Sequence, residues 1–192
     1  MPTNNDPCAR MQDSLAWCQG APVLPGIMRR AYYISKRNIA EWPALDAPDE
    51  KTEIACITDS FTLKADAKWK YIDIIPEKSQ LTSEPQGEYP SQTQLNKLVL
   101  VHPGIGVLPS SATMFNNDDL VFAVFDMKGR VRIVGSERWT TKTTVSQDLG
   151  QGATGTASTT INVEATDVVA APFYCGDIVT DDGTIGGHNP RD

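Results

Sequence analysis

Thr156-Ala-Ser-Thr-Thr-Ile-Asn-Val-Glu-Ala-Thr166 alternates small or polar residues with apolar ones. Because successive side chains of a strand point to opposite faces, Ile161, Val163 and Ala165 fall on one side of an extended chain and polar residues on the other. A period of two is typical of a half-buried β-strand. The segment Pro172-Phe-Tyr-Cys-Gly-Asp-Ile178 follows, and we expect it to complete a final strand pair.

The composition is that of an ordinary soluble globular domain, with 192 residues, 40% of them hydrophobic and 21% charged. Thirteen Pro and fourteen Gly favour many turns over a helical bundle. No apolar run approaches the roughly 20 residues of a membrane span, and the N-terminus lacks a secretory signal pattern. We therefore predict a soluble cytoplasmic product. A net charge of −7 argues against a surface that binds the phosphates of nucleic acid. It is compatible with a surface along which DNA slides, because like charges repel and prevent adsorption.

Catalytic and metal-binding patterns are weak throughout the chain. The four cysteines are scattered at Cys8, Cys18, Cys56 and Cys175, which does not fit a zinc site. Residues 150–155 are rich in glycine but lack the lysine of a phosphate loop. The Asp118-Asp119 and Asp181-Asp182 pairs lie in turn-rich sequence, where turn chemistry explains them better than a metal does. We expect no catalytic residue, no cofactor and no metal, and hence not an enzyme.

The strongest local prediction is a hairpin in the middle of the chain. Residues 120–125, Leu-Val-Phe-Ala-Val-Phe, are apolar on both faces and should form a central strand. Residues 126–129 turn the chain, and residues 130–134 return as its partner. Arg130 and Arg132 then share one face, which we interpret as a solvated or interfacial surface; the arginines could also pair with acids of a neighbouring subunit.

The remaining elements are less regular. We predict one helix over 108–115 and a single helical turn within 35–42. Further strands are expected at 27–34 and 51–57, in a hairpin of 61–64 with 68–75, and in an extended run at 139–145.

Three polar segments are expected to extend from the body. The body is the β domain, which we place at residues 26–179. Residues 1–25 form a proline-rich N-terminal arm anchored by Trp17, and residues 180–192 form a C-terminal tail. Residues 77–97 are predicted to be a long projecting loop or hairpin, because a polar stretch with a Pro/Gly tip joins strand-like ends.

The order of these elements resembles the major tail tube proteins of tailed bacteriophages and prophages. The resemblance is carried by Gly-Arg-Val-Arg-Ile-Val-Gly at 129–135, Thr-Ile-Asn-Val-Glu-Ala-Thr at 160–166 and Ala-Pro-Phe-Tyr-Cys-Gly at 171–176. The opening at 16–34 is similar to phage proteins associated with Bacteroidetes hosts. The resemblance implies a mainly β fold, a two-sheet β-sandwich or barrel of the tail-tube type with one flanking helix. It also implies hexameric rings stacked into a tube for DNA ejection.

The same resemblance implies where copies meet. Ring-to-ring contacts would come from the loop at 79–94 and from the arms at 1–25 and 180–192. The expected inter-subunit residues are Trp17, Gln80, Glu84, Gln86, Glu88, Arg130 and Arg132. The residues expected to face the lumen are Thr160, Asn162 and Glu164. Partners would be further copies, baseplate or tail-terminator proteins, tape measure and sheath proteins as further candidates, and DNA passing non-specifically. The location would be the virion tail, assembled in the host cytoplasm.

Two other functions are kept as alternatives. One is a different virion component, such as a tail terminator, head–tail connector or capsid decoration protein, which would occur in few copies or as a ring that does not stack. The other is a carbohydrate-binding sandwich that uses Trp17, Trp42, Trp69 or Trp139, although four tryptophans are more often part of a core.

Overall fold

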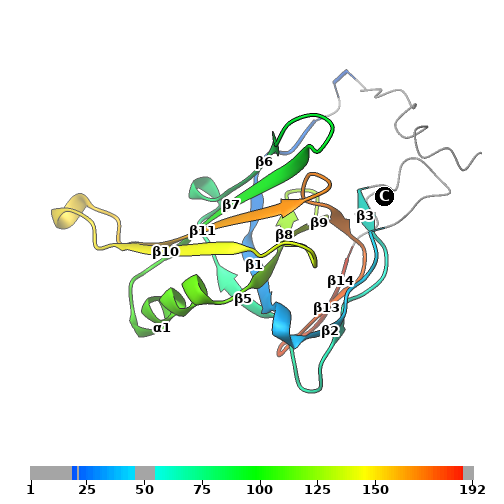
Figure 1. The fold of residues 1–192 in the computed structure, drawn as a ribbon. Coiled ribbons are helices and arrows are strands. Elements are labelled where there is room, and N and C mark those ends of the chain that lie inside the picture. Colours follow the sequence, from blue (N-terminus) through cyan, green and yellow to red (C-terminus); the bar gives the residue numbers. More distant parts are fainter. Residues whose placement is uncertain (1–18, 21, 46–54, 188–192) are drawn as a thin grey trace, which may run out of the picture.

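The structure is a computed structural model that describes residues 19–20, 22–45 and 55–187 (Figure 1). Strands make up 48% of it, so the predicted mainly-β class is confirmed. Two larger sheets dominate. The six-stranded sheet has the order β3 (Cys56–Ile57), β12 (Phe173–Tyr174), β9 (Val131–Val134), β8 (Leu120–Asp126), β1 (Ile27–Ser35) and β5 (Lys70–Asp73). The four-stranded sheet has the order β10 (Lys142–Asp148), β11 (Ser158–Asp167), β7 (Thr93–Pro103) and β6 (Gln80–Gln86).

Smaller elements complete the described part of the chain. Two two-stranded sheets pair β2 (Ile39–Glu41) with β4 (Thr62–Leu63) and β13 (Asp177–Thr180) with β14 (Gly183–Gly186). The α-helix α1 (Val107–Ser111) continues directly into the 3₁₀ segment η3 (Ala112–Asn117). Single 3₁₀ turns occupy η1 (Lys36–Asn38), η2 (Pro76–Lys78) and η4 (Gly152–Thr154).

The first core lies between the two larger sheets, as a sandwich requires. On β11, Ile161, Val163 and Ala165 are each at most 2% exposed, so the predicted alternation of this strand is confirmed. The six-stranded sheet contributes Ala31, Leu120, Phe122, Val124 and Val134, and the four-stranded sheet adds Leu98 and Leu100.

The second core lies on the other face of the six-stranded sheet. Strand β8 supplies Val121 and Ala123 to it, while Leu120, Phe122 and Val124 face the first core. The strand is therefore buried on both faces, as its sequence predicts. The small sheets cover this second face with Ile39, Ile178 and the half-buried Ile185, around an aromatic group that includes Trp69 and Tyr174.

The predicted hairpin of 61–64 with 68–75 is wrong. A turn does separate these segments, with Asp66 in the left-handed region at φ 62°. However, β4 pairs with β2, and β5 pairs with β1. The pairing with β1 sets Ile72 opposite Ala31 over the first core, so burial of apolar surface outweighs the short connection.

Residues 77–97 form a hairpin, one of the two predicted forms, but its strands belong to the four-stranded sheet and do not project from the body. Strands β6 and β7 pair continuously from Gln80–Val99 to Gln86–Thr93, which leaves residues 87–92 as an irregular tip. The polar sequence misleads because one face of this hairpin is solvated while the other supports the first core.

The expected C-terminal tail begins later than predicted. Residues 177–186 fold back as the β13–β14 hairpin, and Ile178 is fully buried. The N–H of Trp69 donates to the carbonyl of Val179 at 2.9 Å, and Asp181 forms ion pairs with Lys68 and Lys70. Residues 188–192 of that prediction lie outside the described part.

Other boundaries also move. Residues 156–166 and 172–178 do not pair with each other, because β11 lies between β10 and β7 while β12 joins the other sheet. The predicted strand at 51–57 is described only as β3, since residues 51–54 lie outside the described ranges. The predicted helix exists but is short, with five α-helical residues before the 3₁₀ segment.

Candidate functional site: the polar face of the four-stranded sheet

The outer face of the four-stranded sheet carries the three residues predicted to face a lumen. Because Ile161 and Val163 point into the first core, Thr160, Asn162 and Glu164 must point away from it. Asn162 and Glu164 are exposed and Thr160 is half-buried. The strand thus has one buried face and one largely solvent-exposed face, as its sequence pattern indicates.

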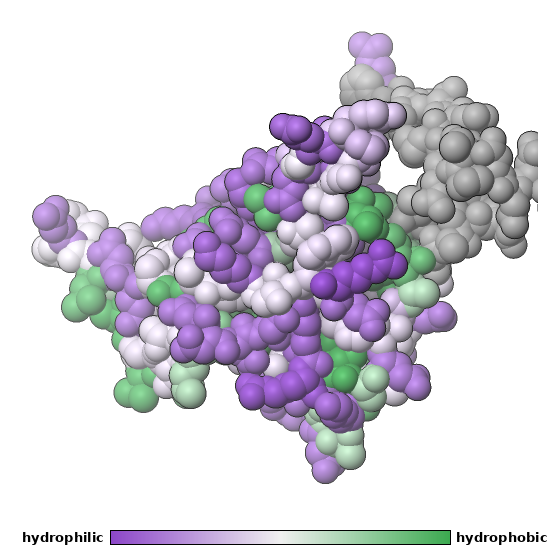
Figure 2. All heavy atoms as spheres, in the orientation of Figure 1, coloured by the Kyte–Doolittle hydropathy of each residue, from purple (hydrophilic) through white to green (hydrophobic). Residues whose placement is uncertain are grey.

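Neighbouring strands continue this polar face on both sides of β11. In the register of the sheet, Asn162 lies opposite Thr144 of β10 and opposite Val99 of β7, and Val99 lies opposite Gln80 of β6. We call the resulting set the polar face. Its members are Gln80, Thr82, Glu84, Gln86, Thr93, Leu95, Lys97, Val99, Val101, Lys142, Thr144, Ser146, Thr160, Asn162, Glu164 and Thr166. Figure 2 shows the corresponding side of the molecule as mostly hydrophilic or neutral in colour.

The structure therefore brings together two groups of residues that the sequence treats separately. Gln80, Glu84 and Gln86, predicted as inter-subunit contacts, lie on the same face as the predicted lumen residues. The amide of Gln86 donates to the hydroxyl of Thr166 at 2.8 Å and so reaches across β7 from β6 to β11. The sequence does not reveal this, because the β6 region is predicted to project from the body as a loop or hairpin and not to join the sheet.

The charges on the polar face balance each other. Lys97 pairs with Glu84, and Lys142 lies 3.6 Å from Glu164. The hydrogen bond from Glu84 raises the pKa of the Lys97 ammonium above its ordinary value. These pairs are solvent-exposed, so they contribute little to stability. Their effect is to leave this face without a net charge of either sign, although the whole chain carries −7.

Both lateral edges of this sheet are protected against further strand pairing. The N–H of Gly104 donates to the carbonyl of Ala157, which shows which residues of β7 bond to β11. Hydrogen bonding alternates along antiparallel strands, so the other residues of β7 bond to β6. The main-chain groups of Leu81, Ser83 and Pro85 therefore point outward along the edge of β6. Pro85 has no N–H to offer there. At the opposite edge, the N–H of Val145 on β10 donates to the side chain of Asn116 on η3 at 2.8 Å.

The remaining predicted contact residues do not share this face. Glu88 lies in the exposed hairpin tip, and Trp17 is outside the described residues. Arg130 pairs with Asp126 at 2.7 Å. Arg132 donates to the carbonyl of Ala171 at 2.8 Å and stacks on an aromatic ring. The turn and the neighbouring strand thus engage both half-buried arginines within the chain, and their inter-subunit role stays a prediction.

Arg132 is held by packing as well as by hydrogen bonding. Its guanidinium lies 3.4 Å from the ring centroid of Phe173, and that of Arg130 lies 4.9 Å from the same centroid. Burial lowers the pKa of Arg132, and the charge of Arg130 acts in the same direction. The ring of Phe173 stacks on the Arg132 guanidinium and offers it a cation–π contact.

Asp126 organises the turn between β8 and β9. Its Oδ1 accepts from the N–H groups of Lys128 and Arg130, and its Oδ2 accepts from the guanidinium of Arg130. Burial raises the pKa of Asp126, but these hydrogen bonds and the charge of Arg130 outweigh it, so the pKa is lowered overall. Gly129 takes φ 84°, as the turn requires.

We expect Asp126→Asn to destabilise the protein by about 1–2 kcal/mol at pH 7. A depressed carboxyl pKa contributes stability that is present above the unfolded-state pKa and is lost as pH falls through the folded value. The gap between the two proteins should therefore close below about pH 4. Urea unfolding at several pH values measures it, and a gap that stays constant with pH would contradict this role.

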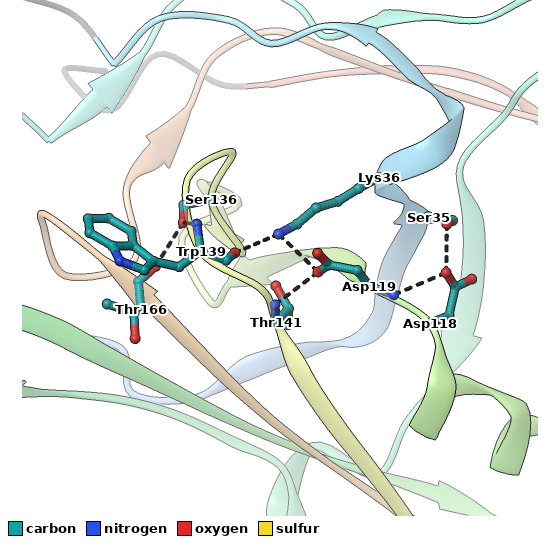
Figure 3. A network of polar contacts seen from close by, with 8 residues as sticks. All are labelled: Ser35, Lys36, Asp118, Asp119, Ser136, Trp139, Thr141 and Thr166. Carbon is teal, nitrogen blue, oxygen red and sulfur yellow. Dashed lines mark hydrogen bonds and ion pairs between the residues drawn. The ribbon is translucent and has the colours of Figure 1, made fainter.

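The Asp118-Asp119 pair serves structure rather than metal binding (Figure 3). Asp119 Oδ1 lies 2.9 Å from Lys36 Nζ and accepts from the N–H of Thr141 at 2.9 Å. Lys36 Nζ also donates to the carbonyl of Trp139 at 2.6 Å. Asp118 accepts from Ser35 Oγ at 3.0 Å. This network ties the end of β1 to the start of β8 and to the chain entering β10.

Replacing Asp119 with alanine should lower the free energy of unfolding by about 2–3 kcal/mol. The change removes the one carboxylate that, among the described residues, pairs with Lys36, whose side chain is 13% exposed. It also leaves the N–H of Thr141 without its acceptor. Denaturant unfolding measures the effect. The matched variant Asp59→Ala alters an exposed carboxylate and should stay within about 0.5 kcal/mol; equal losses in both variants would refute the assignment.

Three tests bear on other kinds of site. In the described ranges, no group of three or more His, Cys, Asp or Glu side chains is placed to hold a metal. Nor does any helix there have the length and hydrophobicity that crossing a membrane requires. None of the three described tryptophans is fully exposed, since Trp69 is 1% exposed, Trp42 is half-buried against Phe61 and Trp139 is half-buried.

Comparisons with known proteins add no relative. No protein-family model matches the chain, and no match is found among curated proteins or solved structures. Functional reasoning therefore rests on the polar face, its edges and the sandwich that supports it.

Proposed function

We propose that this chain is a virion structural protein of a tailed bacteriophage. In this proposal six copies form a ring, and rings stack into the tail tube that conducts DNA during ejection. The observation that carries the proposal is the polar face. The opposite face of the same sheet and both faces of the six-stranded sheet contribute to the two cores, whereas most of this face is exposed or half-buried, with Val101 its buried member.

The chemistry of the polar face suits the wall of a conduit. Its side chains are largely Thr, Ser, Asn and Gln, which remain hydrated and carry no charge. Its lysines Lys97 and Lys142 are each paired with a glutamate. DNA binds to proteins largely because lysines and arginines neutralise its phosphates and release their counterions. Lysines that are already paired with glutamates should therefore bind DNA only weakly. In this proposal DNA meets a wall without net charge, and not the acidic, repelling wall that the net charge of the whole chain suggests.

The dimensions of the sheet are compatible with a DNA conduit. Six copies of a four-stranded sheet supply 6 × 4 = 24 strands. With strands about 4.8 Å apart and tilted by about 40°, a closed arrangement would measure roughly 50 Å between opposite backbones. Side chains on both walls reduce that width, and a duplex still fits.

The protected edges favour a particular kind of lateral contact. Because Pro85 and the Asn116–Val145 bond interrupt the two outward rows of main-chain groups, continuous pairing of β6 with β10 of a neighbour is disfavoured. Neighbouring copies would meet through side chains and short pairings, such as at Leu81 and Ser83. Such a ring assembles without leaving an open sheet that captures unrelated strands.

Electron microscopy of the purified protein tests the proposal. We expect rings or tubes about 100 Å across, on the scale set by sheet and strand spacings. Quantitative mass spectrometry of parent particles should give tens to hundreds of copies per virion. A protein that stays monomeric even with tail-initiating components would refute the proposal, and rings that never stack would instead favour a terminator or connector.

A further inference from the structure

The two larger sheets leave an open cleft at one edge of the sandwich. It has a volume of about 480 Å³ and lies between β1 and β5 on one side and β7 and β11 on the other, with α1 and η3 along its rim. Most of its lining is apolar or aromatic, including Tyr33, Ile72, Leu108, Phe115 and Ile161. Leu108 is 84% exposed, so this apolar lining reaches the molecular surface. Exposed apolar surface of this kind marks a place where another group packs.

A short gap in strand pairing lies beside this cleft. Hydrogen bonding alternates along the β1–β5 pair, which directs the main-chain groups of Tyr71 and Asp73 away from β1. Their neighbours Trp69 and Ile75 donate to other segments, and His102 Nδ1 lies 2.7 Å from the carbonyl oxygen of Asp73. No described residue bonds the N–H or C=O of Tyr71. An incoming main chain would therefore find hydrogen-bonding groups at the edge of the apolar cleft.

The tip of the β6–β7 hairpin, residues 87–92, is a projecting turn. All six of its residues are exposed. The N–H of Ser91 donates to the carbonyl of Glu88 at 2.8 Å and closes the turn. Tyr89 lies within it and is 90% exposed, more than any other large hydrophobic residue of the described ranges. A tyrosine buries a large area at a small cost in side-chain entropy, which suits it to anchor a contact between proteins.

The tip and the cleft lie at opposite ends of the same strand. Strand β7 begins at Thr93, directly after the tip, and ends at Pro103, shortly before α1. Its 11 residues span roughly 35 Å, at about 3.3 Å per residue. Figure 1 shows the β6–β7 tip and α1 on opposite sides of the molecule. A tip therefore does not reach the cleft of its own chain, and only another copy can bring a tip to it.

Charges at the two surfaces are complementary. Glu88 is the one charged residue of the tip. Beside the cleft, the guanidinium of Arg30 lies 4.0 Å from the ring centroid of Tyr71, and the Arg30 side chain is 43% exposed. Arg30 donates to Asp73 through Nε. A guanidinium has five N–H groups, so a carboxylate that arrives beside Tyr71 would meet a cation able to bind it as well.

We propose that the tip of one copy inserts Tyr89 into the cleft of a second copy, where Glu88 pairs with Arg30. The ring fits, because the cleft volume of about 480 Å³ exceeds that of a tyrosine side chain. His102 and Asp73 also line the cleft and offer polar partners to the tyrosine hydroxyl. Each copy has one such tip and one such cleft, so the contact is heterologous and repeats along a row of copies.

The contact goes beyond the proposed function, since a simple row of copies satisfies it whether or not rings form. One turn in one cleft makes a small interface. We therefore expect weak binding between single molecules, and stronger binding where many copies repeat the contact.

Site-specific photo-crosslinking of the full-length protein tests the contact. A photoreactive phenylalanine analogue at position 89 should give dimer-sized and larger products in concentrated protein, with crosslinks to residues 71–73 or 108–115 mapped by mass spectrometry. A mixture of isotopically heavy and light protein shows whether a crosslink joins two chains. Crosslinks within one chain, crosslinks to other segments, or none at all would overturn the proposal.

A blocked cleft supplies the matched variant. Ala112→Trp places a large side chain on the cleft wall and should lower the yield of the crosslink from position 89 about tenfold or more, the loss expected when an aromatic anchor is excluded. The circular dichroism spectrum should be kept. Val179→Ala alters an exposed side chain on β13, outside the cleft, and should leave the yield unchanged. Equal yields in the blocked and control proteins would contradict the contact.

A charge exchange tests the pairing without a bulky substitution. Arg30→Glu places a carboxylate opposite Glu88 and should lower the crosslink yield about fivefold, because like charges repel across an interface. Adding Glu88→Arg to the same chain should restore most of the yield. A double variant no better than Arg30→Glu alone would show that these two residues do not meet.

Mixing two defective proteins separates this inference from the proposed tube. Tyr89→Ala keeps the cleft but lacks the anchor, and Ala112→Trp keeps the tip but lacks the cleft. Neither should extend end to end alone, whereas their mixture should form pairs, of molecules or of rings, and nothing longer; sedimentation velocity and electron microscopy measure this. Tubes formed by Tyr89→Ala alone would overturn the inference and leave the proposed function standing. Pairs of molecules that never close into rings would support the inference and count against the tube.

Discussion

Replacing Phe122 with alanine is expected to lower the free energy of unfolding by about 3–5 kcal/mol, the range for large-to-small changes of a buried aromatic residue. Phe122 is 0% exposed and lies in the middle of β8, where it faces the four-stranded sheet. Its ring lies 6.2 Å from that of Tyr33, centroid to centroid. The loss combines removed apolar burial with a cavity that two hydrogen-bonded sheets cannot collapse to fill.

Chemical denaturation followed by circular dichroism measures this effect. Tyr89→Ala is the matched control, because it also removes an aromatic ring but from a side chain that is 90% exposed. That control should shift stability by no more than about 0.5 kcal/mol. A loss below about 1 kcal/mol for Phe122→Ala would show that the two sheets do not share the packed interior described above.

The second large effect concerns function. Introducing lysine at both Thr160 and Asn162 should leave the fold intact, because both side chains lie on the solvated polar face. In a hexameric ring the double variant adds 2 × 6 = 12 unpaired positive charges to the proposed lumen. We expect DNA passage to slow by about tenfold or more at low salt and to recover as salt rises, since phosphate contacts weaken with ionic strength.

Ejection kinetics of particles carrying the variant subunit measure this effect at low and moderate salt. The matched control places the same two charges at Thr62 and Thr184, which are exposed on the small sheets that cover the second core. That control should eject at the normal rate. Equal slowing in both variants, or none in either, would mean that the polar face does not contact the passing DNA.

Local sequence patterns predict the elements whose partners lie nearby or whose periodicity is strict. The β8–β9 hairpin is one case, because the turn at Asp126 and Gly129 joins strands that are adjacent in the chain. Strand β11 is another, because a strict period of two marks its buried face regardless of which strands flank it. For both, the residues that determine the structure lie within a single short stretch.

Pairing between distant segments is what the sequence does not reveal. Strand β5 follows β4 after a tight turn, yet it pairs with β1, and nothing in the turn signals that choice. Glu84 and Glu164 are another example. They are far apart in the sequence, yet their strands lie in one sheet on either side of β7. The polar face could be predicted strand by strand, but not as a surface.

The contacts of buried polar residues and of arginines are also not evident from the sequence. Asn96 is fully buried and was not singled out, although its Oδ1 accepts from Ser83 and from the N–H of Ala171. Arg132 is predicted to lie on a surface, as charged residues usually do, and it is half-buried in the structure. Its aromatic partner Phe173 is 41 positions away, and only the folded sheet places the ring against it.

The covering of β8 from both sides has a consequence for synthesis on the ribosome. Val121 and Ala123 are translated before Ile178 and Ile185, which shield them and belong to the β13–β14 hairpin. Until that hairpin leaves the exit tunnel, the nascent polypeptide exposes an apolar surface to which chaperones can bind. Premature termination before residue 177 should therefore yield an insoluble product rather than a shortened working subunit.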